Sequence, residues 1–240
     1  MKLAVISDIH GNAEALEKVL ADAEREGVSR VLCCGDMVGY GPEPARVIAL
    51  LRAHGVMCVM GNHDAAVAGV RGTEHMVEEA FNGVVRDRGR LDDDALGWLR
   101  SLPYVATVGD VAIAHGDFSK PAAFQYVMDR RDADPCFWAR SERMLFIGHT
   151  HLPCAYAYTP SRTLMSEPRD FMANPELNYL INVGSVGCPR DVALSSYVIY
   201  DEGTGIVQFR RLPFDLGGYR RTLVRVGQPI PDWVDDLGNA

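Results

Sequence analysis

The most informative segment for the fold is Leu3-Ala4-Val5-Ile6-Ser7-Asp8-Ile9-His10-Gly11-Asn12. It is a short apolar run that ends in polar side chains and a glycine. Short runs that are rich in Val and Ile and bounded by glycine are typical of buried strands. Runs of the same kind lie at 31–36, 56–64, 111–117 and 144–151. The pattern predicts an α/β fold in which polar residues follow the carboxyl ends of buried strands.

The residues at these strand ends are of types that bind metals. They are Asp8, His10, Asp36, Asn62, His63, Asp64, His115, His149 and His151. In open α/β sheets the ligand crevice lies outside the carboxyl ends of the strands, so we expect these side chains to meet at one place. Five of the seven histidines of the chain fall in these motifs. Scattered core or surface histidines would not show this distribution.

The ligand types and their spacing indicate two metal ions. Asp8 and His10 are two residues apart, so on extended backbone they point to one side, and His149 and His151 repeat this spacing. Asp36 has two carboxylate oxygens that could bridge two cations. Mixed imidazole, carboxylate and amide ligands suit Mn, Fe, Co, Ni or Zn better than Mg or Ca. Two such ions ~3.5–4 Å apart would clamp a phosphate and lower the pKa of a bridging water.

Each residue alone also has an ordinary structural explanation. Asp8 could cap the following helix, Asn62 could be a turn residue, and His115 could be a hydrogen-bonded core histidine. Gly35-Asp36 is a common turn. Because five independent coincidences would be needed, we interpret the set as one metal site.

The organisation of the chain predicts one domain that spans residues 1–240. Strands and helices alternate in the first half, and Asn12 is a candidate N-cap for the first helix. Helical segments near 65–102 and 117–143 separate ligand-bearing strands and are expected to cover the site. Later strands are expected at 155–159, 180–183, 195–201 and 205–212, with a hairpin turn before residue 205. A long loop is expected from Pro160 to Pro175.

Composition excludes several classes of protein. The net charge of −8 and the lack of a Lys/Arg run argue against stable nucleic-acid binding. A small phosphate substrate is not excluded, because bound cations reverse the local field. No signal-peptide pattern and no apolar stretch of ~20 residues are found, so we expect a cytoplasmic protein that does not span a membrane. Three of the six cysteines, Cys33, Cys34 and Cys58, lie in apolar runs and are interpreted as inert core residues.

The five motifs, in their order and spacing, resemble the signature blocks of the calcineurin-like metallophosphoesterases. The blocks are Asp8-Ile9-His10, Gly35-Asp36, Gly61-Asn62-His63-Asp64, His115-Gly116 and Gly148-His149-Thr150-His151. The compact size is similar to the bacterial and archaeal phosphodiesterase branch, which is grouped with diadenosine tetraphosphatase-like proteins. The segment from Asn182 to Arg190 is similar to a late glycine-rich block of that branch.

The resemblance implies a four-layer αββα sandwich of two mixed sheets flanked by helices, with the metals at one sheet edge. It implies two divalent transition-metal ions (Mn, Fe, Ni, Co or Zn, with Mn favoured) and a metal-bridging hydroxide as the nucleophile. One ion would be held by Asp8, His10, Asp36 and His151, and the other by Asp36, Asn62, His115 and His149. His63 would face the leaving group, with help from Asp64. Tyr40, Asn62 and Arg190 are the candidate substrate-binding residues.

One departure from the resemblance concerns the second block. Protein Ser/Thr phosphatases carry Gly-Asp-x-Val-Asp-Arg-Gly there, whereas this chain has Gly39 and Tyr40 in place of the later Asp and the Arg. A bidentate Arg clamp on a phosphate monoester is therefore missing at this position. The change favours phosphodiesters of small molecules or nucleotides. Arg190 is equally well explained as a replacement charge or as a surface residue.

Several functions remain open at this level. Within the enzyme class, the alternatives are a phosphomonoesterase similar to the Ser/Thr protein phosphatases, and a dinucleoside polyphosphate hydrolase. A nuclease would need a basic groove, which the sequence does not indicate. A different class is a non-catalytic metal-binding scaffold, since a retromer subunit keeps this fold but lacks the catalytic histidine. The presence of His63 favours catalysis.

Overall fold

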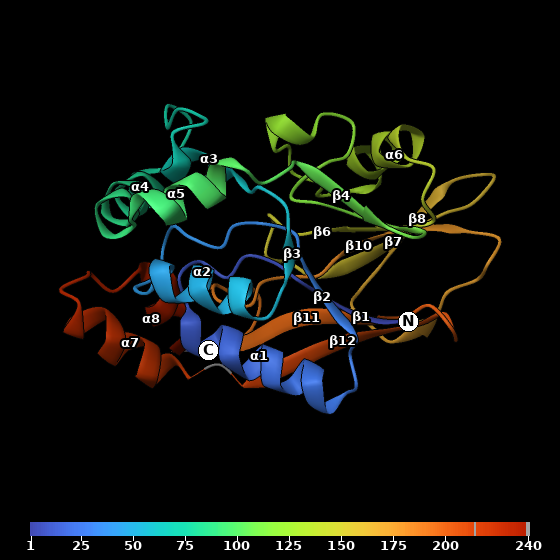
Figure 1. The fold of residues 1–240 in the computed structure, drawn as a ribbon. Coiled ribbons are helices and arrows are strands. Elements are labelled where there is room, and N and C mark those ends of the chain that lie inside the picture. The colour runs from blue at the N-terminus through green and yellow to red at the C-terminus, as the bar shows by residue number, and fades with distance from the viewer. Residues whose placement is uncertain (214, 239–240) are drawn as a thin grey trace.

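Two six-stranded β-sheets form the centre of the structure, with helices on their outer faces (Figure 1). The computed structural model describes residues 1–213 and 215–238. The first sheet has the order β3-β2-β1-β11-β12-β9, with bounds Met57–Cys58, Arg30–Cys33, Lys2–Ile6, Leu194–Asp201, Ile206–Pro213 and Phe171–Met172. The second has the order β4-β5-β6-β10-β7-β8, with bounds Val105–Val108, Val111–Ala114, Met144–Ile147, Asn178–Asn182, Cys154–Tyr158 and Thr163–Ser166.

Strand β1 shows why the apolar runs are continuous and not alternating. Leu3 and Val5 pack in the apolar cluster between the two sheets, whereas Ala4 and Ile6 pack in the cluster beneath the helices. A strand that is buried on both faces needs apolar side chains at every position. The second sheet repeats this arrangement, because β6 sends Phe146 toward the first sheet and Leu145 toward its own helix layer.

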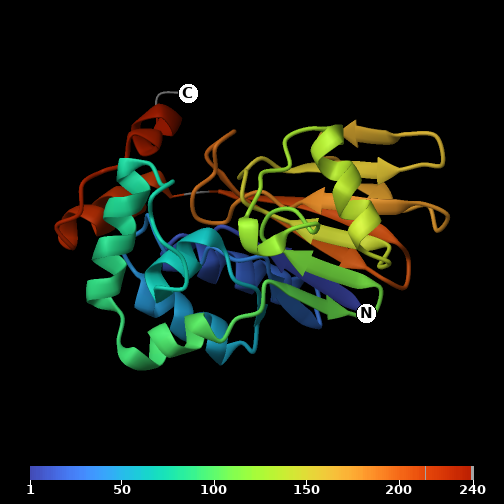
Figure 2. The same cartoon turned by 90° about the horizontal axis from the view of Figure 1, so that it is seen from above.

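The helices divide between the two outer layers. Helices α1 (Ala13–Arg25) and α2 (Pro44–Ala53) pack on the first sheet, and α3 (Asn62–Ala68), α4 (Glu78–Arg90) and α5 (Asp93–Arg100) pack on one another beside α2 and extend the same apolar cluster. Helix α6 (Arg130–Ala139) packs on the second sheet, and the view from above shows it lying over those strands (Figure 2). The short 3-10 helix η1 (Pro121–Ala123) precedes α6, and α7 (Leu216–Arg225) and α8 (Asp232–Gly238) pack against each other near the C-terminus. The αββα sandwich of two mixed sheets is confirmed.

The strand pairing brings the five polar blocks to one edge of the sandwich. Strands β1, β2 and β3 are parallel to one another, and so are β5, β6 and β10. The carboxyl ends of these strands therefore meet in each sheet. Every one of the five blocks begins within three residues of the end of β1, β2, β3, β5 or β6. The edge predicted from the sequence is the edge that carries the candidate site.

Two expectations about local structure were wrong. The segment from Pro160 to Pro175 contains the edge strands β8 and β9 and is not a continuous loop. Both strands lie at sheet edges and are largely exposed, so they lack the apolar signal of a buried strand. The run Val56–Met60 forms only the two-residue strand β3. Among the described residues, no helix is long and apolar enough to cross a membrane.

Candidate metal centre

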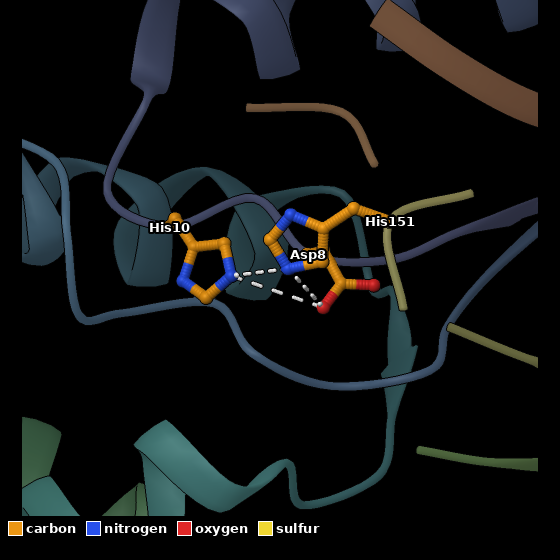
Figure 3. Close-up of side chains that lie close together, drawn as sticks. All are labelled: Asp8, His10 and His151. Atoms are coloured by element: carbon orange, nitrogen blue, oxygen red, sulfur yellow. Dashed lines mark hydrogen bonds and ion pairs between the residues drawn. The ribbon is translucent and has the colours of Figure 1, made fainter. Parts of the chain in front are cut away.

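A first group of ligand-type side chains joins the loop after β1 to the loop after β6. Asp8 Oδ1 lies 3.3 Å from His151 Nε2 and 3.8 Å from His10 Nε2. The two histidine Nε2 atoms are 3.2 Å apart. All three side chains are buried, and Figure 3 shows both rings directing a nitrogen toward the carboxylate. The three residues form a candidate cation site.

A second group lies beside the first and uses the loops after β2, β3, β5 and β6. His115 Nε2 lies 3.2 Å from Asp36 Oδ2, 3.0 Å from Asn62 Oδ1 and 3.0 Å from His149 Nδ1. Asp36, His115 and His149 meet as a candidate cation site, and Asn62 adds a neutral oxygen. The structure thus brings together all seven residues that the sequence assigned to metals.

Asp36 lies between the two groups. Its Oδ2 atom is 3.2 Å from His115 Nε2 in the second group and 3.8 Å from His10 Nε2 in the first. Its other oxygen, Oδ1, accepts the backbone N–H of His63 at 2.9 Å. One carboxylate oxygen therefore faces both groups, as a bridging ligand would require.

Backbone carbonyls orient three of the imidazoles toward the centre. The Nδ1–H groups of His10, His115 and His151 donate to the carbonyls of Val38, Cys34 and Cys188. A carbonyl only accepts, so the proton is on Nδ1 and the Nε2 lone pair points inward when the ring is neutral. Lone pairs of His10 and His151 then face each other at 3.2 Å, which is favourable only with a cation between them. The donor set fits divalent metal ions.

The loops that carry these ligands adopt unusual backbone conformations. Among the residues that the structure describes, six other than glycine have positive φ, and five of them are Asp8, His10, Asp36, His149 and His151. Such conformations are uncommon in L-residues and concentrate at functional sites. The expectation that Asp8 and His10 share a side through extended backbone was wrong, because their φ angles are 53° and 48°.

Burial and neighbouring charges shift the ionisation of the cluster. Burial lowers the pKa of His10 well below its usual value, and burial together with His115 lowers the pKa of His149 to about 3. Although burial opposes it, the Asp36 carboxylate raises the pKa of His115 to about 9. Neutral rings at His10 and His149 keep their lone pairs for a metal, whereas a metal must displace a proton from His115.

His63 lies in the first turn of α3 and not at the end of an extended strand. Its Nε2 atom lies 4.0 Å from Asp36 Oδ2, and its ring meets those of His10 and Tyr40 at centroid distances of 4.9 and 4.8 Å. The Nδ1 atom of His63 is buried and has no hydrogen-bond partner in the described part of the chain. His63 also groups with His10 and Asp36 as ligand types. Its leaving-group role stays a prediction.

Asp64 holds the loop that carries Asp36. Its carboxylate accepts the backbone N–H groups of Asp36 and Gly61 at Oδ2, and those of Met37 and Val38 at Oδ1, at 2.8–3.3 Å. Its described hydrogen bonds do not reach the His63 ring. The geometry therefore favours a positioning role for Asp64 over a direct role in catalysis.

The other predicted substrate-binding residues lie at the margin of the cluster. Tyr40 is buried, and its ring packs 4.8 Å from that of His10. Arg190 is exposed and lies near Cys188 and Tyr40. Two further residues lie at the site without having been predicted. The ring of Tyr126 stacks on that of His149 with a centroid distance of 3.9 Å, and Arg71 lines one cavity together with Asn62. Neither belongs to a motif, so no local pattern marked them.

Comparison with known proteins is consistent with this geometry. A profile described as calcineurin-like phosphoesterase matches residues 1–182. The chain belongs to the calcineurin-like phosphoesterase family. This family comprises binuclear metal enzymes, and the chain is a metal-dependent phosphoesterase.

Relatives with named activities match parts of this phosphoesterase. It is 30% identical to a symmetrical bis(5'-nucleosyl)-tetraphosphatase of Methylococcus capsulatus over 48% of this chain and 42% of the relative. It is 38% identical to the phosphodiesterase YfcE of Escherichia coli over 28% of this chain and 42% of the relative. A crystal structure of a metallophosphoesterase from Sphaerobacter thermophilus superimposes with a TM-score of 0.84 at 30% identity, covering 99% of this chain and 98% of the other.

Proposed function

We propose that this phosphoesterase hydrolyses phosphodiesters with two divalent metal ions, one held by Asp8, His10, Asp36 and His151 and the other by Asp36, Asn62, His115 and His149. The observation that carries the proposal is the position of Asp36 Oδ2, which faces both groups. When bound, two adjacent ions supply the chemistry by neutralising the phosphate and lowering the pKa of a shared water. Mn as the native metal and a cytoplasmic location stay predictions.

The preference for diesters is argued from the second block. Gly39 and Tyr40 occupy the positions of the phosphatase Asp and Arg, and Tyr40 packs its ring against His10 and His63 without adding a positive charge. A dianionic monoester gains most from an Arg clamp, whereas a monoanionic diester needs only the charge of the ions.

His63 is the residue that we assign to the leaving group. Its Nε2 edge faces Asp36, and burial lowers its pKa, so the ring is neutral near pH 7 with Nδ1 or Nε2 carrying one proton. We propose that the proton sits on Nε2 and is directed at the departing oxygen. Such assistance contributes roughly 10²–10⁴-fold in rate.

The experiment compares kcat/KM for an aryl phosphodiester and an aryl phosphomonoester with the same leaving group, using protein reconstituted with Mn. The proposal predicts the larger value for the diester. A strong preference for the monoester would contradict it and would support the phosphomonoesterase alternative. Protein treated with a chelator is the control, since it should lose both activities.

A further inference from the structure

A cavity of about 230 Å³ opens beside the second ligand group. Asn62 and His149, two predicted ligands of one ion, form one side of it. The opposite side comes from the segment between α3 and α4 and from the segment around η1. The side chains that matter here are Asn62, Arg71, His75, Phe124, Tyr126 and His149. A group bound at the ions can therefore extend directly into this cavity.

Arg71 is held at the cavity in a fixed position. Its Nη1 donates to the carbonyls of Ala122 and Ala123 at 2.9 and 3.1 Å, and its guanidinium lies 5.3 Å from the centroid of the Phe124 ring. Among the described residues, all hydrogen bonds of Arg71 run through Nη1. The Nε–H and Nη2–H groups remain for a ligand, and this edge of a guanidinium matches two phosphate oxygens.

The charge of the cavity differs from that of the whole chain. Arg71 and His75 line it, and no Asp or Glu does. Two acids lie just outside the lining: Glu74, whose carboxylate is against Gly72, and Asp36, which the ions would neutralise. Because the chain carries a net charge of −8, a cavity lined by an arginine and by no carboxylate favours anions more than the rest of the surface does.

We propose that Arg71 binds a second anionic group, a phosphate, on one arm of the substrate, so that the preferred diesters carry an additional phosphate. The inference rests on the proposed function for the reacting phosphate, which the ions held by Asp36 and Asn62 would bind. The cavity is smaller than a typical pocket for a whole ligand, so it fits one arm.

A control variant at a second arginine, Arg100, distinguishes a role of Arg71 in ligand binding from a role in structural support. Arg100 also donates to a backbone carbonyl, that of Ala68 at 2.9 Å, but it does not line the cavity. Arg71→Gln and Arg100→Gln both remove a cation that donates to backbone carbonyls, those of η1 for Arg71 and that at the end of α3 for Arg100. Only Arg71→Gln removes the proposed phosphate ligand, and Arg71→Lys keeps the charge at that place.

The test is titration calorimetry with Mn-loaded protein and two probes, adenosine 3′,5′-bisphosphate and adenosine 5′-monophosphate. Neither probe contains a diester, so the proposed diester hydrolysis would not consume them. Wild-type protein and Arg100→Gln should bind the bisphosphate roughly 10–100-fold more tightly than the monophosphate, the range for one charge-assisted contact. Arg71→Gln should bind both equally, and Arg71→Lys should recover part of the preference. Manganese content measured on each variant identifies any that lose the metals.

Two results would overturn the proposal. One is an equal affinity of the wild-type protein for the two probes, which would show that no second phosphate is bound. The other is an equal weakening of both probes by Arg71→Gln with metals retained, which would assign Arg71 to the reacting phosphate or to loop support. Failure of the proposed function would appear separately, as absence of diester hydrolysis by wild-type protein that still prefers the bisphosphate.

Discussion

A Cβ atom added to Gly39 would lie 2.4 Å from Nδ1 of His63, so the imidazole ring fills the space that any side chain at position 39 would need. Helix α4 closes the other side of this loop. Asp87 accepts the N–H of Gly39 at 2.7 Å, and a Cβ at Gly83 would lie 2.4 Å from the Gly39 carbonyl oxygen. Protein Ser/Thr phosphatases have an aspartate at the position of Gly39. In this chain the His63 ring is positioned by close packing against Gly39, and its Nδ1 atom has no hydrogen-bond partner in the described part of the chain.

Gly39→Ala should displace His63 and lower kcat, because Gly39 also has a φ of 122° that disfavours an L-residue. We expect at least a tenfold loss of diester hydrolysis with both metals retained, measured by kinetics and metal analysis. The matched control is Gly97→Ala in α5, where nothing lies within 4 Å of the added Cβ. That control should keep full activity and gain ~0.5–1 kcal/mol of stability. Full activity in Gly39→Ala would show that the ring does not need its present position.

His63→Ala should keep the fold and both metals while reducing kcat. A general acid matters least when the departing oxygen is already stable, so the loss should be much larger for alkyl than for activated aryl diesters. Rates across a series of leaving groups measure this difference. Loss of a metal would make His63 a ligand, and unchanged rates on every substrate would remove it from the mechanism.

The sequence predicts the ligand set because the relevant physics is local. A buried parallel strand needs a continuous apolar run, and its carboxyl end is fixed by the glycine and polar residues that follow. The five blocks could therefore be placed at one edge before any contact was known. The late strands β10, β11 and β12 were also found, since their apolar residues pack between the sheets.

The parts that the sequence did not predict depend on contacts between distant segments. The positive φ angles at Asp8 and His149 accompany a hydrogen bond from the His149 backbone N–H to Asp8 Oδ2 at 2.9 Å, across 141 residues. Arg71 is held at the cavity by hydrogen bonds to the carbonyls of Ala122 and Ala123. No spacing in the sequence relates Arg71 to that segment. The edge strand β8 has one buried residue, so its pattern resembled that of a loop.

Asp64→Asn should weaken metal binding although Asp64 is not a predicted ligand. The four backbone N–H groups that converge on its carboxylate need an acceptor, and an amide NH₂ would face donors. Leaving buried donors unpaired costs about 1–3 kcal/mol each, and the loop that carries Asp36 should loosen. A manganese titration should show weaker binding at the site shared by Asp36. An unchanged titration and melting temperature would show that the loop holds without this carboxylate.

A buried carboxylate far from the metal edge gives a prediction about pH. Although burial opposes it, hydrogen bonds from Tyr197, Arg25 and Arg210 lower the pKa of Asp22 below its usual value. A lowered pKa in the folded state stabilises the fold above the unfolded pKa of ~3.9, and this contribution is lost as pH falls through the folded pKa.

Asp22→Asn should therefore reduce the free energy of unfolding by about 2–3 kcal/mol at pH 7. The difference from wild type should shrink below about pH 4. Urea denaturation at several pH values measures it, with the exposed Glu24→Gln as the control on the same helix. A difference that stays constant down to the lowest pH would contradict the assignment.

The measurement that tests the account most directly is the metal content of protein reconstituted with Mn, determined by mass spectrometry beside Asp36→Asn. Wild-type protein should bind two equivalents per chain, because two ligand groups meet at Asp36. Binding at both sites should be weaker in the variant, since a shared carboxylate is lost from each. One equivalent or none in the wild-type protein, or a variant that loses a single ion while the other binds as before, would contradict this two-metal assignment.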